Sequence, residues 1–176
     1  MANKQNYKVV VIENPLLDIT VNDDNNALHD KYKLEHGLAC LVSEETMGIH
    51  DEIFQMEGKE TTPGGAALNS ARVAAHCLKN MGVDNEVAYV GCIAKDAAGD
   101  ILVDTLDKAG MHGEFAITTE EGTGRCAVLT HNKERTMCAN IGASQKYPTS
   151  HFETHQVCSC LIPLTPYCRN CSRTLV

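Results

Sequence analysis

The residues best suited to binding chemistry are Pro63, Gly64 and Gly65, which stand directly before an apolar-periodic segment at 67–78. The periodicity predicts a helix. Successive glycines let a ligand approach backbone N–H groups without a Cβ in the way, and a helix start adds unpaired donors and partial positive charge. Asn69 adds an amide that both donates and accepts on the first helical turn. This corner suits hydroxyls or anions, and the alternative is a tight turn whose glycines only allow close helix packing.

An acidic residue upstream complements that corner. Residues 9–12 are all β-branched, which predicts a buried strand that Asn14 and Pro15 end. We expect Asp18 just past this strand end, where open α/β sheets place their ligands. A carboxylate only accepts hydrogen bonds, so Asp18 suits the two neighbouring hydroxyls of a sugar, with a glycine amide and Asn69 opposite.

Together, the segment Asn-Pro-Leu-Leu-Asp at 14–18 and the segment Pro-Gly-Gly-x-x-x-Asn at 63–69 resemble the ribokinase-like (pfkB) carbohydrate kinases, and within that family the adenosine kinases. The resemblance implies ATP-dependent phosphorylation of adenosine to AMP, with Mg²⁺. It also implies site residues by position. The residues implied to bind the ribose are Asn14, Asp18, Gly64, Gly65 and Asn69. Those implied to line an apolar pocket for the base are Leu41, Cys126, Met137 and Ile141. Arg135 is implied to contact the transferring phosphate. Without the resemblance, the four apolar residues are ordinary core and Arg135 is a solvated hairpin residue.

One departure from the family concerns Glu13, which stands where many relatives have glycine. We expect its carboxylate near the site, where it would repel phosphate. A second feature, Ala98-Gly99-Asp100, superficially resembles the family's catalytic Gly-Ala-Gly-Asp. We reject that assignment because the surrounding residues match a strand-to-helix connection, with Asp96 as the helix N-cap. The sequence therefore offers no catalytic base.

The resemblance covers residues 7–153 and then fades. The family's Gly-Ala-Gly-Asp and Asn-x-x-Glu motifs, which serve ATP and Mg²⁺, are absent from the 176 residues. We expect an N-terminal part of a kinase domain at 1–153, truncated and with little or no turnover, and a divergent tail at 154–176. The tail carries Cys158, Cys160, Cys168 and Cys171. It is either a non-homologous tail or a small zinc site.

The order of the strands and helices that position these residues indicates an α/β fold. We expect a parallel sheet flanked by helices, with a small β lid. Strands at 9–12 and 86–91 enclose the helix at 67–78, a β-α-β unit with parallel pairing. A further helix is predicted at 97–109, and another from an N-cap at Ser43 to residue 56. Strands at 114–118, 125–131 and 135–141 follow one another without helices, so we assign all three to the lid.

Composition narrows the function classes. The chain carries a net charge of −8 and is 43% hydrophobic, a balance that argues against a nucleic-acid surface. No apolar run reaches membrane-spanning length and no signal segment begins the sequence, so we expect no membrane association and a cytosolic monomer, with the nucleus as a second location. Two other functions stay open: a non-catalytic nucleoside-binding or regulatory protein, and a different ribokinase-like sugar or nucleoside kinase.

Overall fold

The computed structural model describes residues 7–154 as strands and helices in mixed order. The strands are β1 (Val9–Ile12), β2 (Leu16–Asn22), β3 (Ala39–Leu41), β4 (Glu60–Gly64), β5 (Val87–Ala94), β6 (His112–Thr118), β7 (Gly124–His131) and β8 (Glu134–Asn140). The helices are α1 (Ala27–Tyr32), α2 (Ile49–Gln55), α3 (Ala66–Asn80), α4 (Ala97–Lys108), the 3-10 helix η1 (Gly142–Lys146) and α5 (Thr149–Thr154). The four tail cysteines assigned above lie outside the described residues.

The strands form two sheets. The first, here the parallel sheet, has the order β1-β5-β6 with parallel pairing throughout. The second, here the lid sheet, has the order β3-β8-β7-β2-β4 and mixes parallel and antiparallel pairs. The predicted α/β class, with a parallel sheet and a β lid, is confirmed. The lid sheet is the larger of the two within the described residues.

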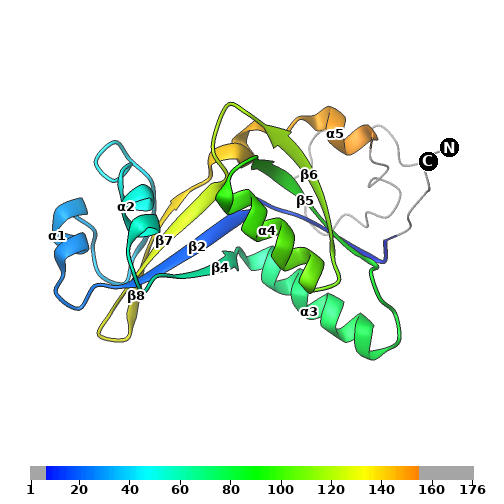
Figure 1. Cartoon of the computed structure of the whole chain (residues 1–176), viewed down its shortest axis with the longest axis horizontal. Helices are drawn as coiled ribbons and strands as arrows, with labels where there is room; N and C mark the ends of the chain where they lie inside the picture. Colours follow the sequence, from blue (N-terminus) through cyan, green and yellow to red (C-terminus); the bar gives the residue numbers. More distant parts are fainter. Residues whose placement is uncertain (1–6, 155–176) are drawn as a thin grey trace.

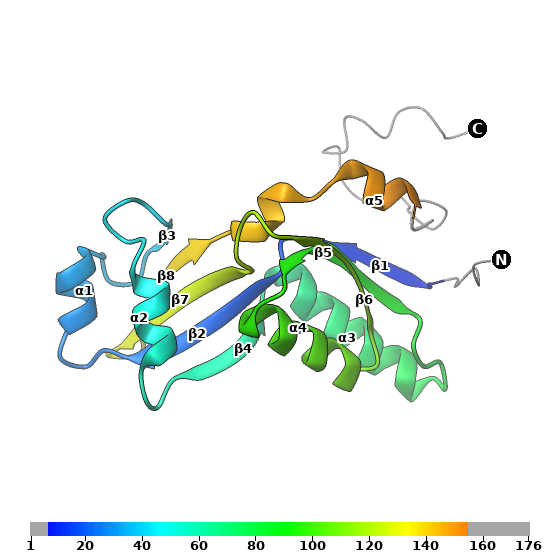
Figure 2. The same cartoon turned by 45° about the horizontal axis from the view of Figure 1, so that its top comes forward.

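Helices α3 and α4 run side by side along one face of the parallel sheet, while η1 and α5 lie on its other side (Figures 1 and 2). The core between sheet and helices is built from residues such as Leu68, Ala71, Tyr89, Leu102 and Leu106. Both helices begin where their sequence indicates. Asp96 caps α4 by accepting from the Gly99 N–H at 2.8 Å. No helix among residues 7–154 combines the length and apolarity needed to cross a bilayer.

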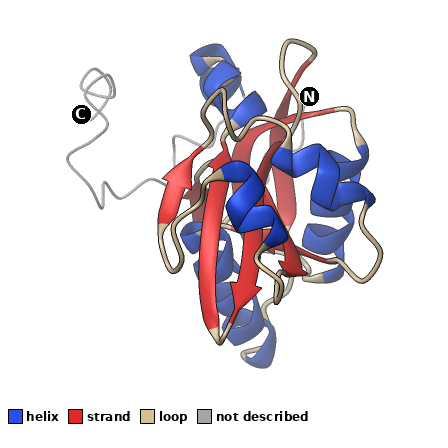
Figure 3. Cartoon of the chain, turned by 90° about the vertical axis from the view of Figure 1, so that its left-hand side faces the viewer, coloured by secondary structure: helices blue, strands red, loops and turns tan. Residues whose placement is uncertain are grey.

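The lid sheet buries one of its two faces. Strand alternation directs Ile19, Val21, Ala127, Leu129 and Cys138 to the same side, where they pack with residues of α1 and α2. Both of these helices sit at the end of the molecule away from α3, as the chain traced in Figure 1 shows, and Figure 3 shows the strands as the central layer with helices outside. The opposite face of the lid sheet carries the predicted site residues.

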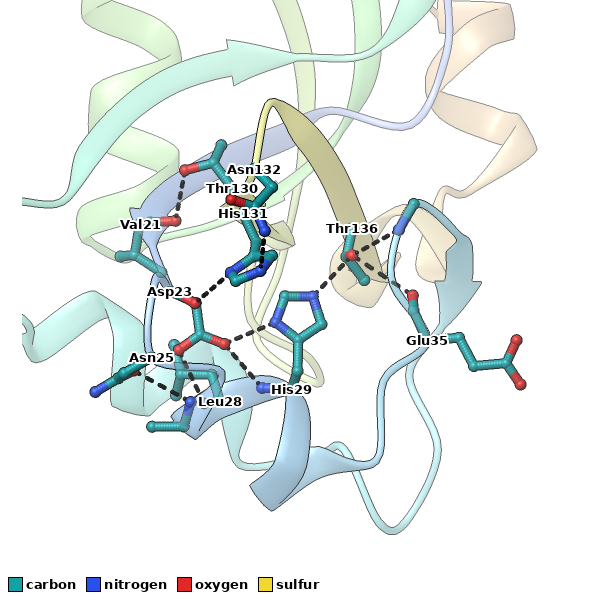
Figure 4. Close-up of polar contacts among 12 residues, drawn as sticks. Val21, Asp23, Asn25, Leu28, His29, Glu35, Thr130, His131, Asn132 and Thr136 are labelled. Carbon is teal, nitrogen blue, oxygen red and sulfur yellow. Dashed lines mark hydrogen bonds and ion pairs between the residues drawn. The ribbon is translucent and has the colours of Figure 1, made fainter.

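A buried polar network joins α1 to the lid sheet (Figure 4). Asp23, 2% exposed, accepts from the N–H groups of Leu28 and His29 and from Nδ1 of the His29 ring, at 3.0, 3.0 and 2.7 Å. The other ring nitrogen of His29 lies 2.9 Å from the Thr136 hydroxyl on β8. Burial by itself raises the pKa of Asp23, but these hydrogen bonds outweigh it and hold the pKa below its ordinary value.

Three sequence predictions are corrected. Asp18 lies inside β2, in the lid sheet, and not just past the end of the first strand. Strand β6, predicted as part of the lid, pairs with β5 in the parallel sheet instead. The helix predicted from Ser43 begins only at Ile49, after a turn that Thr46 holds by accepting the Ser43 N–H at 2.8 Å. In the first two cases the local pattern left the partner strand undetermined, and long-range pairing decided it. In the third case the local turn between Ser43 and Thr46 delays the start of the helix.

The Asp23 network generates a prediction about stability and pH. Asp23→Asn should lower the free energy of unfolding at pH 7 by about 2–3 kcal/mol, because buried donors lose an ionised acceptor. The folded pKa of Asp23 is depressed, so its contribution is present above the ordinary value of 3.8 and is lost as pH falls through the folded pKa. Denaturant unfolding of both proteins between pH 2 and 7 measures this, with exposed Asp30→Asn as the matched control. A constant difference across that range would contradict the assignment.

Candidate functional site

The open face of the lid sheet gathers five of the residues predicted for the site. Asp18 on β2 pairs with Cys126 on β7, Cys126 with Ala139 on β8, and Ala139 with Leu41 on β3. Paired residues share a face and alternate residues return to it, so Met137 and Arg135 point to the same side as Asp18. Leu41 is 64% exposed and Met137 36%, whereas Cys126 is 6% exposed. This face is an apolar surface with a carboxylate near one end.

Asp18 lies directly against Gly64. Antiparallel pairing of β2 with β4 sets Asp18 opposite Thr62 and Leu16 opposite Gly64. A Cβ on Gly64 would stand 2.0 Å from Oδ1 of Asp18, well inside any allowed contact, so the carboxylate occupies the space that a side chain would fill. Gly65 follows with φ of +99°, a backbone conformation that other residues rarely adopt. The two glycines thus bring the acid and the start of α3 together.

The carboxylate of Asp18 is half-buried and lacks a fixed partner. Among residues 7–154, no hydrogen bond or ion pair reaches it. Burial raises the pKa of Asp18, and the positive charge of Arg135 only partly offsets that effect. A partly desolvated acceptor without a donor is costly to the fold, and it is the arrangement expected of a group that accepts hydrogen bonds from a ligand.

Two backbone N–H groups at the start of α3 already donate to a side chain of the protein. Oε2 of Glu13 accepts from the N–H groups of Ala67 and Leu68 at 2.9 and 3.3 Å, and it would lie 2.7 Å from a Cβ on Gly65. Glu13 therefore supplies from a distant segment the cap that the N-cap residue Gly65 cannot provide. The sequence alone placed Glu13 near the site but missed this role. The helix donors that we had assigned to a ligand are bound to Glu13 instead.

The remaining predicted residues lie around this centre. Asn14 is exposed in the link between β1 and β2 and borders a hollow of about 340 Å³, together with Ile12, Glu13, Gly91, Ser144 and Tyr147. Asn69 is exposed on the first turn of α3, and its N–H donates to the Gly65 carbonyl at 3.2 Å. Ile141 is half-buried directly after β8 and starts η1. Asp100 is exposed within α4.

The capping contact predicts the effect of removing Glu13. Glu13→Ala should lower the free energy of unfolding by about 1 kcal/mol, the usual cost of losing an N-cap, because two helix donors lose their acceptor. Glu13→Gln keeps a side-chain oxygen and should recover part of that loss. Chemical denaturation followed by circular dichroism measures both. Glu57→Ala, which removes an exposed carboxylate, is the matched control and should change little. Equal effects at positions 13 and 57 would argue against the cap.

Comparison with known proteins gives this geometry a context. The pfkB family carbohydrate kinase profile matches residues 41–161. Adenosine kinase of Dictyostelium discoideum is 35% identical over 153 residues, which are 86% of this chain and 43% of that protein. The adenosine kinase of Schizosaccharomyces pombe is 37% identical over 80% of this chain and 39% of its own length.

Solved structures agree with these relatives. The structure of Trypanosoma brucei brucei adenosine kinase superimposes with a TM-score of 0.75 at 38% identity, over 84% of this chain and 44% of that one. Schistosoma mansoni adenosine kinase in complex with adenosine gives 0.76 at 31% identity, over 87% and 43%. The chain spans about two fifths of the length of these relatives. The predicted resemblance is confirmed, and the chain belongs to the pfkB family of carbohydrate kinases.

Proposed function

We propose that this chain is the nucleoside-binding part of an adenosine kinase, an enzyme that phosphorylates adenosine to AMP with ATP. One observation carries the proposal: the half-buried carboxylate of Asp18 lies on Gly64, has no donor among residues 7–154, and shares a sheet face with exposed apolar side chains. The proposal draws on relatives named adenosine kinase, one of them solved with adenosine bound.

The chemistry of the open face matches the two ends of a nucleoside. The neighbouring hydroxyls of a ribose supply the donors that the Asp18 carboxylate lacks. Leu41, Cys126 and Met137 offer a flat base an apolar surface on the same face. Arg135 lies further along that face and its charge acts on Asp18, so it is available to balance a phosphate that approaches the sugar.

The phosphoryl-transfer step needs groups that the described residues do not provide. Within 7–154, no three His, Cys, Asp or Glu side chains converge to hold a metal ion, so Mg²⁺ does not fit this part of the chain as a protein-held ion. The relatives are more than twice as long as the stretch they share with this chain. We therefore assign ATP and Mg²⁺ to regions that lie beyond the shared stretch. The residues described here bind and orient the acceptor sugar.

A single substitution separates binding from stability. Asp18→Asn should weaken adenosine binding about 10- to 100-fold, since a charged acceptor is worth 1.5–3 kcal/mol to its donors. The same change should raise the stability at pH 7. The folded pKa of Asp18 is raised, so its ionisation costs stability once pH exceeds the ordinary value of 3.8. Titration calorimetry with adenosine and denaturant unfolding measure the two effects.

The controls for this experiment use both the protein and the ligand. Asp24→Asn, on the exposed turn after β2, should leave adenosine binding unchanged. 2′,3′-Dideoxyadenosine, which lacks the two neighbouring ribose hydroxyls but keeps the 5′-hydroxyl, should bind the wild type as weakly as adenosine binds Asp18→Asn. If ribose or inosine bound as tightly as adenosine does, the result would favour a different sugar or nucleoside kinase. Equal adenosine affinity for wild type and Asp18→Asn would overturn the proposed site.

A separate prediction concerns catalysis by the 176-residue chain alone. With adenosine and magnesium ATP, AMP formation should not exceed the rate measured without protein, because the sequence contains no Gly-Ala-Gly-Asp motif. Chromatographic detection of AMP checks this, with a full-length adenosine kinase as the positive control. AMP formation at a rate near that control would refute the division of labour proposed above, while leaving the binding site intact.

A further inference from the structure

Two cysteines lie opposite each other at the edge of the lid sheet. Strand β3 pairs with β8 in parallel, and the register sets Cys40 opposite Cys138. Neighbouring strands run about 4.7–4.9 Å apart, which falls inside the range of about 4.4–6.8 Å that disulfides span between Cα atoms. Both thiols are free. Directly paired residues direct their side chains to the same face, so the two sulfurs face a common space.

The other cysteines of the described residues are excluded as partners. Cys126 on β7 is opposite Ala139, and Ala127 is opposite Cys138, so alternation sends Cys126 to the other face of the lid sheet. Cys92 lies in β5 of the parallel sheet and Cys77 in α3. Cys40 and Cys138 therefore form a defined pair within 7–154.

The two thiols have different surroundings. Cys138 belongs to the core of the lid sheet and is 1% exposed, whereas Cys40 is exposed on the edge strand. Burial raises the pKa of Cys138 to about 11, Thr46 lowers it in part, and the thiol of Cys40 adds to the rise. An oxidant in solution can reach the exposed thiol of Cys40, and the buried thiol of Cys138 lies on the neighbouring strand.

We propose that Cys40 and Cys138 form a reversible disulfide when the protein meets hydrogen peroxide. Peroxide transfers one oxygen to the Cys40 sulfur, giving a sulfenic acid and one water. The Cys138 sulfur then attacks the Cys40 sulfur, the S–O bond breaks, and the hydroxyl leaves with the Cys138 proton as a second water. Two thiols lose two electrons, and one peroxide is reduced to two waters.

The bridge would fix a short strand at the edge of the lid sheet. Strand β3 has three residues, all exposed, and β8 is its partner in the sheet order. A covalent link to Cys138 in the core would hold this edge strand in register. Leu41, the neighbour of Cys40, would be held with it on the open face. That last consequence rests on the proposed function, whereas the bridge itself does not.

Peptide mapping tests the bridge directly in the full chain. Trypsin places Cys40 in the peptide 34–59, Cys138 in 136–146 and Cys126 in 126–133, while the tail cysteines fall in other peptides. After stoichiometric peroxide and alkylation of the remaining thiols, mass spectrometry should find 34–59 joined to 136–146. Dithiothreitol should separate the two peptides again. Amide hydrogen exchange at 39–42 should slow in the oxidised protein.

Two variants keep the test decisive. Cys40→Ser should abolish the joined peptide and the slowed exchange. Because Cys40 is exposed, this variant should fold as the wild type does. Cys77→Ser, which removes another exposed thiol, should leave both signals unchanged. Peroxide treatment that leaves Cys40 as a sulfinic acid, or joins it to a tail cysteine instead of Cys138, would overturn the proposal.

Discussion

The contact between the Asp18 carboxylate and Gly64 is the constraint on which the site depends. It depends on the antiparallel pairing of β4 with β2, which sets Gly64 opposite Leu16, two residues before Asp18. It also requires glycine, since a Cβ would stand 2.0 Å from the carboxylate oxygen. The fold accepts a half-buried acid with a raised pKa at this point. Such local cost is typical of a group whose partner is a ligand.

The two faces of the lid sheet differ: one is packed, and the other carries the proposed site. One face packs under α1 and α2 and is anchored by Asp23, whose every carboxylate contact is internal. The other face keeps apolar side chains exposed beside Asp18, which accepts no hydrogen bond from residues 7–154. The two aspartates, five residues apart, therefore have opposite pKa shifts. Hydrogen bonds to the ionised form explain the first, and desolvation explains the second.

Glu13 changes how the glycine corner works in this chain. A helix start preceded by glycines attracts anions and hydroxyls in general, but here the donors of Ala67 and Leu68 bind a carboxylate of the protein itself. In the proposed site, the hydrogen bonds to the sugar are therefore assigned mainly to Asp18, and the glycines allow its close approach. Family membership fixes the architecture of this corner. The residue at position 13 decides how much of it a ligand can use.

The sequence by itself determined the family, through two short motifs, and the elements with strong local signals: the helices α3 and α4, the β7–β8 hairpin, and the parallel pairing of β1 with β5. Local periodicity and caps suffice for these. Only the tertiary structure decided that Asp18 lies within a strand, that β6 joins the parallel sheet, and that Glu13 caps a helix 54 residues away. Those features depend on which distant segments pair, and the residues within one strand do not identify its partner.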